Sequence, residues 1–301
     1  MSGLVERTPL LNLATHAILI VGLVVLLMPL WIVFVASTHD FVTVNRIPMP
    51  LLPGDHLVEN WVAAWNKGDF AAKLTNSLIM ATGVTVGKIA IAALTAFAIV
   101  YFRFPFRMLV FWIIFITLML PLEVRIVPTY AVAADALRPF REVFSVFGLQ
   151  VGLPQWNLLN SYTGLILPLV ATATGTFLYR QFFLTIPDEL VEAAKMDGAG
   201  PIRFFIDVLL PLSKTTMAAL ATILFVYAWN EFLWPLLIIT DHATYGVATV
   251  ELSRLVPGPL FGEPPIWNIA MAGTLIVMIP PLIVVILLQR WFVRGLVASD
   301  K

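Results

Sequence analysis

The stretch PDELVEAAKMDGAGPIRFFIDVLLP, from Pro187 to Pro211, is a charged island between runs of apolar residues. Its first half alternates acidic residues with small apolar ones, and its second half places aliphatic and aromatic residues at helical intervals. This pattern predicts two short helices joined by a corner.

Local signals support both the helices and the corner. Thr185 and Asp188 have the spacing of a capping box, which predicts a helix start near Thr185. Gly198 can take the left-handed conformation that ends a helix, and Pro201 suits the first turn of the next helix. One face of that second helix should carry its apolar residues, Ile202, Phe205, Val208 and Leu209. On these signals alone, an amphipathic loop at a membrane surface and a docking element both remain open.

The composition on either side of the island is that of a membrane protein. The chain has 301 residues, of which 60% are hydrophobic and 12% charged, and its mean hydropathy is +0.93. A soluble domain would carry about 25% charged residues. The net charge is zero, so nothing favours nucleic acid as a partner. The chain has no cysteine, which excludes disulfides and thiolate chemistry.

Six apolar stretches are long enough to be membrane spans, which need about 20 residues each. They cover approximately 11–37, 74–100, 108–131, 162–179, 215–239 and 267–288. We therefore predict an all-α integral membrane protein with one transmembrane domain over residues 1–301 and a cytoplasmic loop at 185–212. The first stretch is too long for a signal-peptide core and lacks a small-residue cleavage site.

The distribution of Lys and Arg predicts the orientation. With both termini in the cytoplasm, ten basic residues fall on inner segments and six on outer ones. The island at 187–211 is then cytoplasmic, and the segments at about 39–73, 135–160 and 241–266 lie outside.

Charged residues within the spans are the candidates for function, because each costs about 2.5–3.5 kcal/mol at a helix centre. Glu123 and Arg125 either fix the helix bundle or line a path for the substrate, where Arg125 would attract an anion. Asn230 and Glu231 form hydrogen bonds between helices or line a polar pore. Lys88 needs a partner or a polar cavity, and a structural pair is the simpler interpretation.

Catalytic and metal-binding motifs are missing from the sequence. The four histidines have no metal-like spacing such as i, i+4, so no metal site is predicted. There is no Gly-x-Ser-x-Gly motif and no glycine-rich phosphate loop ending in Lys-Ser or Lys-Thr. The chain itself should therefore not be an enzyme and should not hydrolyse ATP.

The island also resembles a known family. Glu192-Ala193-Ala194, Asp197-Gly198-Ala199 and Leu210-Pro211-Leu212, at this spacing, are similar to the EAA loop in permease subunits of binding-protein-dependent ABC importers. The resemblance is to the carbohydrate-type permeases and extends over almost the whole chain. Four stretches resemble the E-type permeases of sn-glycerol-3-phosphate importers: 111–129, 178–205, 234–241 and 289–301.

The resemblance implies the type I importer permease fold and a heteromeric assembly in the bacterial inner membrane. Partners would be a second, different permease, two copies of an ATP-binding subunit that holds ATP and magnesium, a periplasmic binding protein and membrane lipid. The EAA loop would be a coupling helix that docks on the ATPase, with Glu192, Ala193, Ala194, Asp197 and Gly198 as its key residues.

The substrate that the resemblance implies is sn-glycerol 3-phosphate or a related glycerophosphodiester. Two other interpretations remain, namely a permease for a neutral sugar or oligosaccharide, and a secondary transporter, which would not need a docking element. The residues Glu123, Arg125, Asn230 and Glu231 are the candidates for the substrate path.

Overall fold

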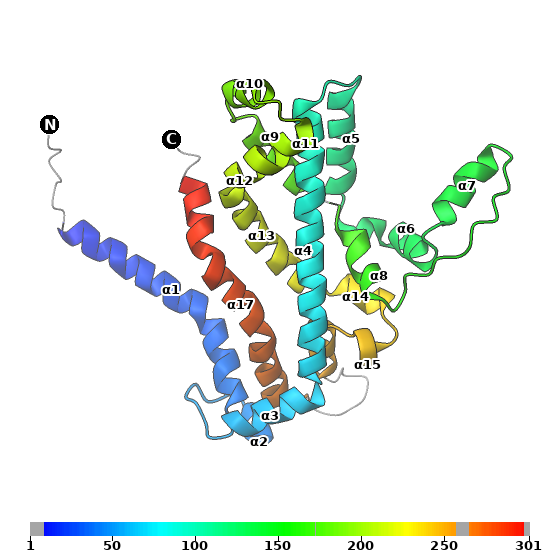
Figure 1. Ribbon diagram of the computed structural model, residues 1–301. Helices are drawn as coiled ribbons and strands as arrows, with labels where there is room; N and C mark the ends of the chain where they lie inside the picture. The colour runs from blue at the N-terminus through cyan, green and yellow to red at the C-terminus, as the bar shows by residue number, and fades with distance from the viewer. Residues whose placement is uncertain (1–8, 172, 257–264, 298–301) are drawn as a thin grey trace. The chain divides into compact units, whose positions relative to one another are not determined.

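The computed structural model of this protein describes residues 9–171, 173–256 and 265–297, and all regular structure in these residues is helical (Figure 1). The chain forms two compact units, residues 1–70 with 252–278 and residues 71–251 with 279–301. Parts of the predicted third outer segment, 257–264, and of the C-terminal stretch, 298–301, lie outside the described residues. The single transmembrane domain and the number of six spans stay predictions.

The first unit contains the N-terminal helix and a short polar connection. Its helices are α1 (Pro9–Ser37), α2 (Phe41–Val44), α3 (Leu57–Lys67) and the first part of α17 (Trp267–Val297). Asn60 of α3 donates hydrogen bonds to the carbonyls of Ser37 and His39, and it accepts one from the side chain of Asn268 at 2.8 Å. This amide pair joins three segments that are distant in sequence.

The second unit contains the charged island and most of the remaining helices. These are α4 (Phe70–Tyr101), α5 (Arg107–Met119), α6 (Leu122–Ala134), α7 (Arg138–Val146), α8 (Tyr162–Ile166), η1 (Leu167–Leu169), α9 (Ala173–Phe183), α10 (Asp188–Met196), α11 (Pro201–Phe204), the π-helical turn η2 (Phe205–Leu209), α12 (Leu210–Leu212), α13 (Lys214–Trp229), α14 (Leu233–Ile238), α15 (His242–Tyr245) and α16 (Ala248–Arg254).

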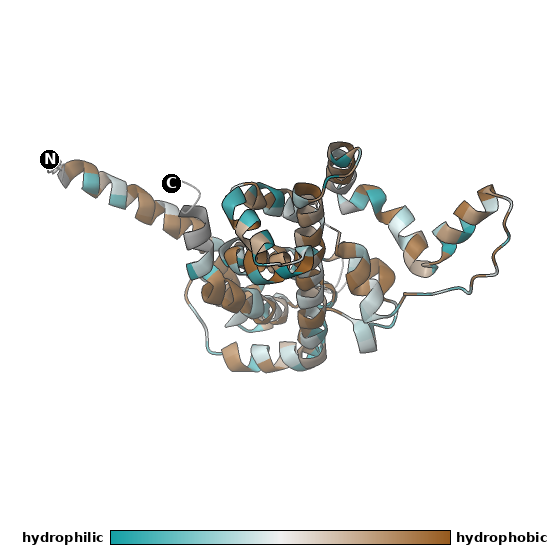
Figure 2. Ribbon diagram, turned by 45° about the horizontal axis from the view of Figure 1, so that its top comes forward, coloured by the Kyte–Doolittle hydropathy of each residue, from teal (hydrophilic) through white to brown (hydrophobic). Residues whose placement is uncertain are grey.

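The long helices have the length and composition of membrane spans. Among the described residues, Leu10–Ser37, Phe70–Tyr101 and Trp267–Trp291 are continuous apolar helices, and two bent helix pairs bring the number to five if each pair is one span. Apolar residues cover their outer surfaces (Figure 2), and along α1 the side chains from Leu10 to Ile32 are largely exposed. Such a surface is stable in lipid rather than in water.

Three of the predicted spans are broken into shorter helices, two of them at prolines. The stretch at 108–131 is divided between α5 and α6, because Leu120 and Pro121 are extended and Pro121 has no amide hydrogen to donate. The stretch at 162–179 is divided into α8 with η1 and then α9, and Pro168 lies at the break. The stretch at 215–239 ends its first helix at Trp229 and continues as α14.

Two glycines allow α4 to approach its neighbour closely. Gly83 and Gly87 are four residues apart on the same face of α4, the spacing that brings membrane helices together. A Cβ atom added at Gly87 would lie 2.5 Å from Cγ1 and 3.1 Å from Cβ of Val170, and one at Gly83 would lie 2.6 Å from Cδ1 of Ile166. The segment after α8 therefore packs almost directly on the α4 backbone.

A tryptophan compensates for the proline in η1. In a continuous helix the carbonyl of Gly164 would accept from the amide four residues later, but that residue is Pro168, which has none. The side chain of Trp234, which is fully buried, donates its Nε1 hydrogen to this carbonyl at 3.1 Å. The bond fixes α14 against α8.

Candidate functional site: the coupling element and a charged cluster

The island folds as two short helices with a corner between them, as predicted. We call residues 187–204 the coupling element, after the role that the sequence analysis predicts for them. Its first helix, α10, begins after Pro187, with Asp188 and Glu189 in the first turn, where acidic side chains interact favourably with the helix dipole. The predicted capping box at Thr185 is wrong. That hydroxyl donates to the carbonyl of Phe182 at 2.7 Å and so belongs to the turn that ends α9.

Gly198 makes the corner. Its φ angle is +74°, in the left-handed region, and its amide donates to the Lys195 carbonyl at 3.0 Å. The amide of Ala199 reaches back to the carbonyl of Ala194 at 2.9 Å, which completes a Schellman-type helix end. The next helix, α11, starts at Pro201, as predicted.

The second helix differs from the predicted apolar face. Phe204, Phe205 and Leu209 are buried, whereas Ile202 is 73% exposed. The buried face of this segment includes Phe204, which precedes the π-helical turn η2, and Ile202 lies away from that face. Arg203 and Asp207 lie off the buried face and form an ion pair with an Nε to Oδ2 distance of 3.3 Å.

The outer surface of α10 is open. Glu192, Ala193, Asp197 and Gly198 are exposed, and Ala194 is half-buried. Neither Glu192 nor Asp197 forms an ion pair with another described residue. The helix therefore presents two free carboxylates around a small-residue patch where another backbone could approach closely.

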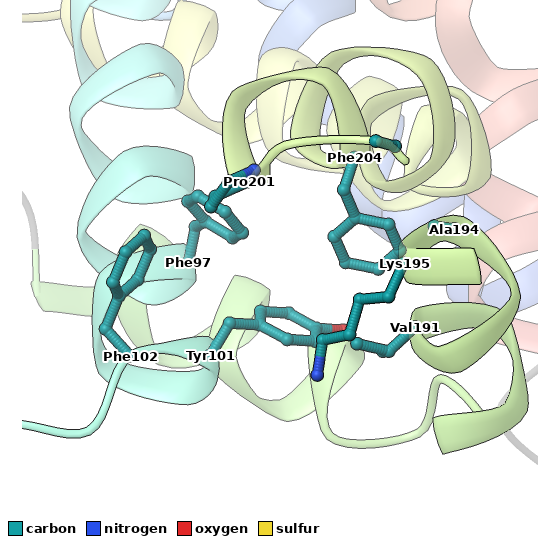
Figure 3. A pocket seen from close by; sticks show the side chains of 9 residues that line it. Phe97, Tyr101, Phe102, Val191, Ala194, Lys195, Pro201 and Phe204 are labelled. Carbon is teal, nitrogen blue, oxygen red and sulfur yellow. The ribbon is translucent and has the colours of Figure 1, made fainter. Parts of the chain in front are cut away.

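The inner surface of α10 closes a small apolar pocket of about 190 Å³. The pocket lies between α10, the C-terminal end of α4 and α11, and the side chains that line it point toward one another (Figure 3). Its lining residues are Phe97, Tyr101, Phe102, Val191, Ala194, Lys195, Ala199, Pro201 and Phe204. An aromatic core continues below it, with Phe97 and Phe205 at a centroid distance of 4.9 Å. A force on α10 would therefore act on α4, α9 and η2 through packed rings.

The charged residues of the spans lie in the second unit. Glu123, on α6, is exposed, while Arg125, one half-turn further on, is half-buried. The Nε atom of Arg125 is buried and has no hydrogen-bond partner among the described residues. Neither Glu123 nor Arg125 forms an ion pair with another residue that the structure describes.

Asn230 and Glu231 lie in the turn between α13 and α14. The side chain of Asn230 donates to the carbonyl of Val226 at 2.8 Å, which ends α13. Glu231 accepts from the amide of Trp234 at 3.4 Å, and its own carbonyl accepts from the hydroxyl of Thr249 at 3.1 Å. Both polar residues thus shape the break in this span.

Lys88 of α4 and Tyr227 of α13 are further polar residues within the apolar helices of the second unit. The Nζ atom of Lys88 lies 4.6 Å from the centre of the Tyr227 ring, a cation–π distance. Glu231 and Arg125 act on the Lys88 charge electrostatically, and Glu123 acts on Glu231. The sequence shows no partner for Lys88, and the fold places the ring of Tyr227, on α13, against it.

Comparison with known proteins shows the family of this chain. Residues 88–297 match the model of the family described as "Binding-protein-dependent transport system inner membrane component", and the chain belongs to this family. It is 48% identical over 304 residues to the "sn-glycerol-3-phosphate transport system permease protein UgpE" of Yersinia enterocolitica, covering 99% of this chain and 100% of that one. The protein of the same name from Escherichia coli O157:H7 is also 48% identical, over 305 residues.

Solved structures share the fold. A bacterial ABC transporter involved in the import of the acidic polysaccharide alginate contains a chain that superimposes with a TM-score of 0.72 at 18% identity. The match covers 97% of this protein and 100% of that chain. A second structure of an alginate ABC transporter, in complex with a pentasaccharide-bound periplasmic protein, gives a TM-score of 0.66 at 19% identity. The protein is thus a multi-pass membrane component with the ABC importer permease fold.

Proposed function

We propose that this chain is the permease subunit of an ATP-driven importer that moves sn-glycerol 3-phosphate, or related glycerophosphodiesters, across the bacterial inner membrane. The observation that carries the proposal is the 48% identity to permeases of sn-glycerol-3-phosphate transport, which extends over 99% of the chain. The half-buried arginine of α6, Arg125, fits a path for an anion.

The proposed assembly contains this chain, a second and different permease, two copies of an ATP-binding subunit and a periplasmic binding protein. ATP and magnesium would bind to the ATP-binding subunits, and this chain would hold no cofactor. Both termini and the coupling element would face the cytoplasm. The basic residues that predict this orientation include Arg103, Arg107 and Arg180, of which Arg180 is close to the coupling element in sequence.

In this proposal the coupling element carries the ATPase motion to the spans. Ala193 and Ala194 would allow close contact with the ATPase, Glu192 and Asp197 would supply charges for docking, and Gly198 would hold the corner. The aromatic core behind α10 would transmit the movement to α4 and α9. ATP binding would then bias the spans between inward-facing and outward-facing states without any chemistry in this chain.

Reconstitution of the complete importer in proteoliposomes tests the proposal. We expect sn-glycerol 3-phosphate, presented with the binding protein, to stimulate ATP hydrolysis and to be taken up only when ATP is supplied. A neutral sugar that stimulates hydrolysis while sn-glycerol 3-phosphate does not would contradict the substrate. Uptake driven by an ion gradient without ATP would contradict the importer and favour a secondary transporter.

A further inference from the structure

Residues 135–158, which we call the arm, have no role in the proposed function so far. The helix of the arm, α7, has Pro139 in its first turn and is followed by Gly148, whose φ of +73° lies in the left-handed region. The amide of Gly148 donates to the carbonyl of Ser145 at 3.0 Å. Residues 149–158 then return without helix or strand (Figure 1). The arm thus has its own signals for a helix start and a helix end.

Two backbone hydrogen bonds close the base of the arm. The amide of Ala136 donates to the carbonyl of Trp156, and the amide of Leu158 donates to the carbonyl of Ala133, both at 2.9 Å. The outgoing and the returning segment are therefore tied together where the arm begins and ends.

The charged side chains of the arm bind within the arm. Arg141 forms an ion pair with Asp135 and donates two hydrogen bonds to carbonyls of the returning segment, each at 3.1 Å. Arg138 pairs with Glu142 at 2.7 Å. These two basic and two acidic residues are all the charged residues between 135 and 158, so the net charge of the arm is zero.

The opposite face of α7 is apolar and uncovered. Phe140, Val143, Phe144 and Phe147 occupy positions i, i+3, i+4 and i+7, which form one face of a helix. All four are exposed, Phe147 at 74%, and none of the nine residues of α7, all of them described, is buried. This arrangement is unfavourable in water, because the apolar face is left open. The arm therefore needs a partner with an apolar surface.

Lipid is a poor partner for the arm. A helix that lies on a membrane surface uses free basic residues to attract lipid headgroups, whereas both arginines of the arm are paired with carboxylates. The returning segment cannot enter the bilayer core, because a backbone without helix or strand leaves its polar groups unsatisfied there. A groove on a protein can accommodate both parts of the arm.

The exposed apolar area is that of a permanent protein interface. The eight exposed apolar side chains from Phe140 to Trp156 offer roughly 700 Å². A specific interface buries about 800 Å² on each partner, and permanent interfaces are the more apolar ones. Transient docking is often steered by charge, and the arm has no net charge to supply it. A subunit that stays bound is thus a better match than a binding protein that docks and leaves.

We propose that the arm lays the apolar face of α7 into a groove between helices of the second permease subunit. Amphipathic helices bind such grooves through side chains at i, i+3, i+4 and i+7, so Phe140, Phe144 and Phe147 are the anchors. The ion pair of Arg141 and Asp135 fixes the shape of the arm before binding, which lowers the cost of ordering it. The inference rests on the proposed function, which supplies the second permease.

Cross-linking tests the contact directly, because the chain has no cysteine to interfere. Phe144→Cys is introduced on the apolar face, and Ser145→Cys, on the face that carries the arginines, is the matched control. Each thiol is labelled with a benzophenone in the complete importer, with the binding protein present, and illuminated. Mass spectrometry identifies the product. We expect at least tenfold more cross-linking to the second permease from Phe144→Cys than from Ser145→Cys.

Retention of the second permease is the other measurement. The double variant Phe140→Ser with Phe144→Ser should lower at least tenfold the amount of second permease that co-purifies with this chain, because two anchors become polar. Arg138→Gln breaks only an exposed ion pair and should retain the second permease. The amount of this chain should be equal in all variants.

Several results would overturn the inference. One is a cross-link from Phe144→Cys to phospholipid, to the binding protein or to a second copy of this chain. Another is equal cross-linking from both positions, or none from either. Full retention of the second permease in the double variant would do the same. If the double variant lowers the amount of this chain, the cross-link decides alone.

The proposed function fails by a different result. An importer that forms the cross-link but does not take up sn-glycerol 3-phosphate refutes the proposed substrate and leaves the contact of the arm in place.

Discussion

Replacing Gly198 tests how the coupling element works, because the effect can be calculated from one backbone angle. The φ of Gly198 is +74°, and a Cβ atom built there meets nothing within 4 Å. A side chain would therefore cost only backbone strain, which is about 1–2 kcal/mol for an ordinary L-residue in the left-handed region. This corresponds to a roughly 5- to 30-fold lower population of the native corner.

A graded series follows from this calculation. Gly198→Asn should couple nearly normally, because asparagine tolerates the left-handed region, while Gly198→Ala should be weaker. Gly198→Val should be the weakest, since its branched Cβ makes the left-handed region still less favourable. Gly200→Ser is the matched control. Gly200 has a φ of −71°, also with open space around its Cβ position, so a side chain there causes no strain.

The assay is the binding-protein-stimulated ATPase rate of the reconstituted importer, together with the amount of ATPase that co-purifies with the permeases. We expect both to fall in the order Asn, Ala, Val at position 198 and to remain at the wild-type level in the Gly200 variant. Equal performance of Gly198→Asn and Gly198→Val, in either direction, would refute the reasoning from the backbone angle.

Two further predictions concern the packing of the second unit, and both are measured as the thermal midpoint Tm of the purified protein in detergent. Gly87→Ala should destabilise by about 1–3 kcal/mol, because its new Cβ overlaps the stiff side chain of Val170. Gly22→Ala should not destabilise the protein, because Gly22 lies in open space on α1. Equal Tm values for the two variants would contradict the close packing of Val170 on Gly87. Trp234→Phe should cost about 1–3 kcal/mol, since the carbonyl of Gly164 loses its donor. The same change at Trp156, which is 52% exposed, should leave Tm unchanged, and an unchanged Tm at Trp234 would show that the bond contributes nothing.

The coupling element was largely predictable because its signals are local. Gly198 and Pro201 have backbone preferences that do not depend on distant residues, and both occupy the predicted positions. Two details were not predictable. Thr185 has the sequence spacing of a cap, but its hydroxyl donates to the carbonyl of Phe182 in the preceding turn. Ile202 lies away from the buried face, which includes Phe204 instead.

The breaks in the spans could be anticipated only in part. Pro121 is a local signal, because it has no amide hydrogen to donate, and the structure begins α6 directly after it. The turn at Asn230 has no proline before it. That turn depends on hydrogen bonds with Trp234 and Thr249, residues that lie beyond it in the chain.

The sequence by itself determined the class of this protein. Hydropathy, charge distribution and the pattern around Glu192 are properties of the chain that need no contact between distant residues. Only the tertiary structure decided which residues of different helices meet. It placed the ring of Tyr227 on α13 at 4.6 Å from the Nζ atom of Lys88 on α4, and it placed the Nε1 hydrogen of Trp234 on the carbonyl of Gly164. These pairs are distant in the sequence, so their contacts depend on how the helices pack, and no local pattern encodes them.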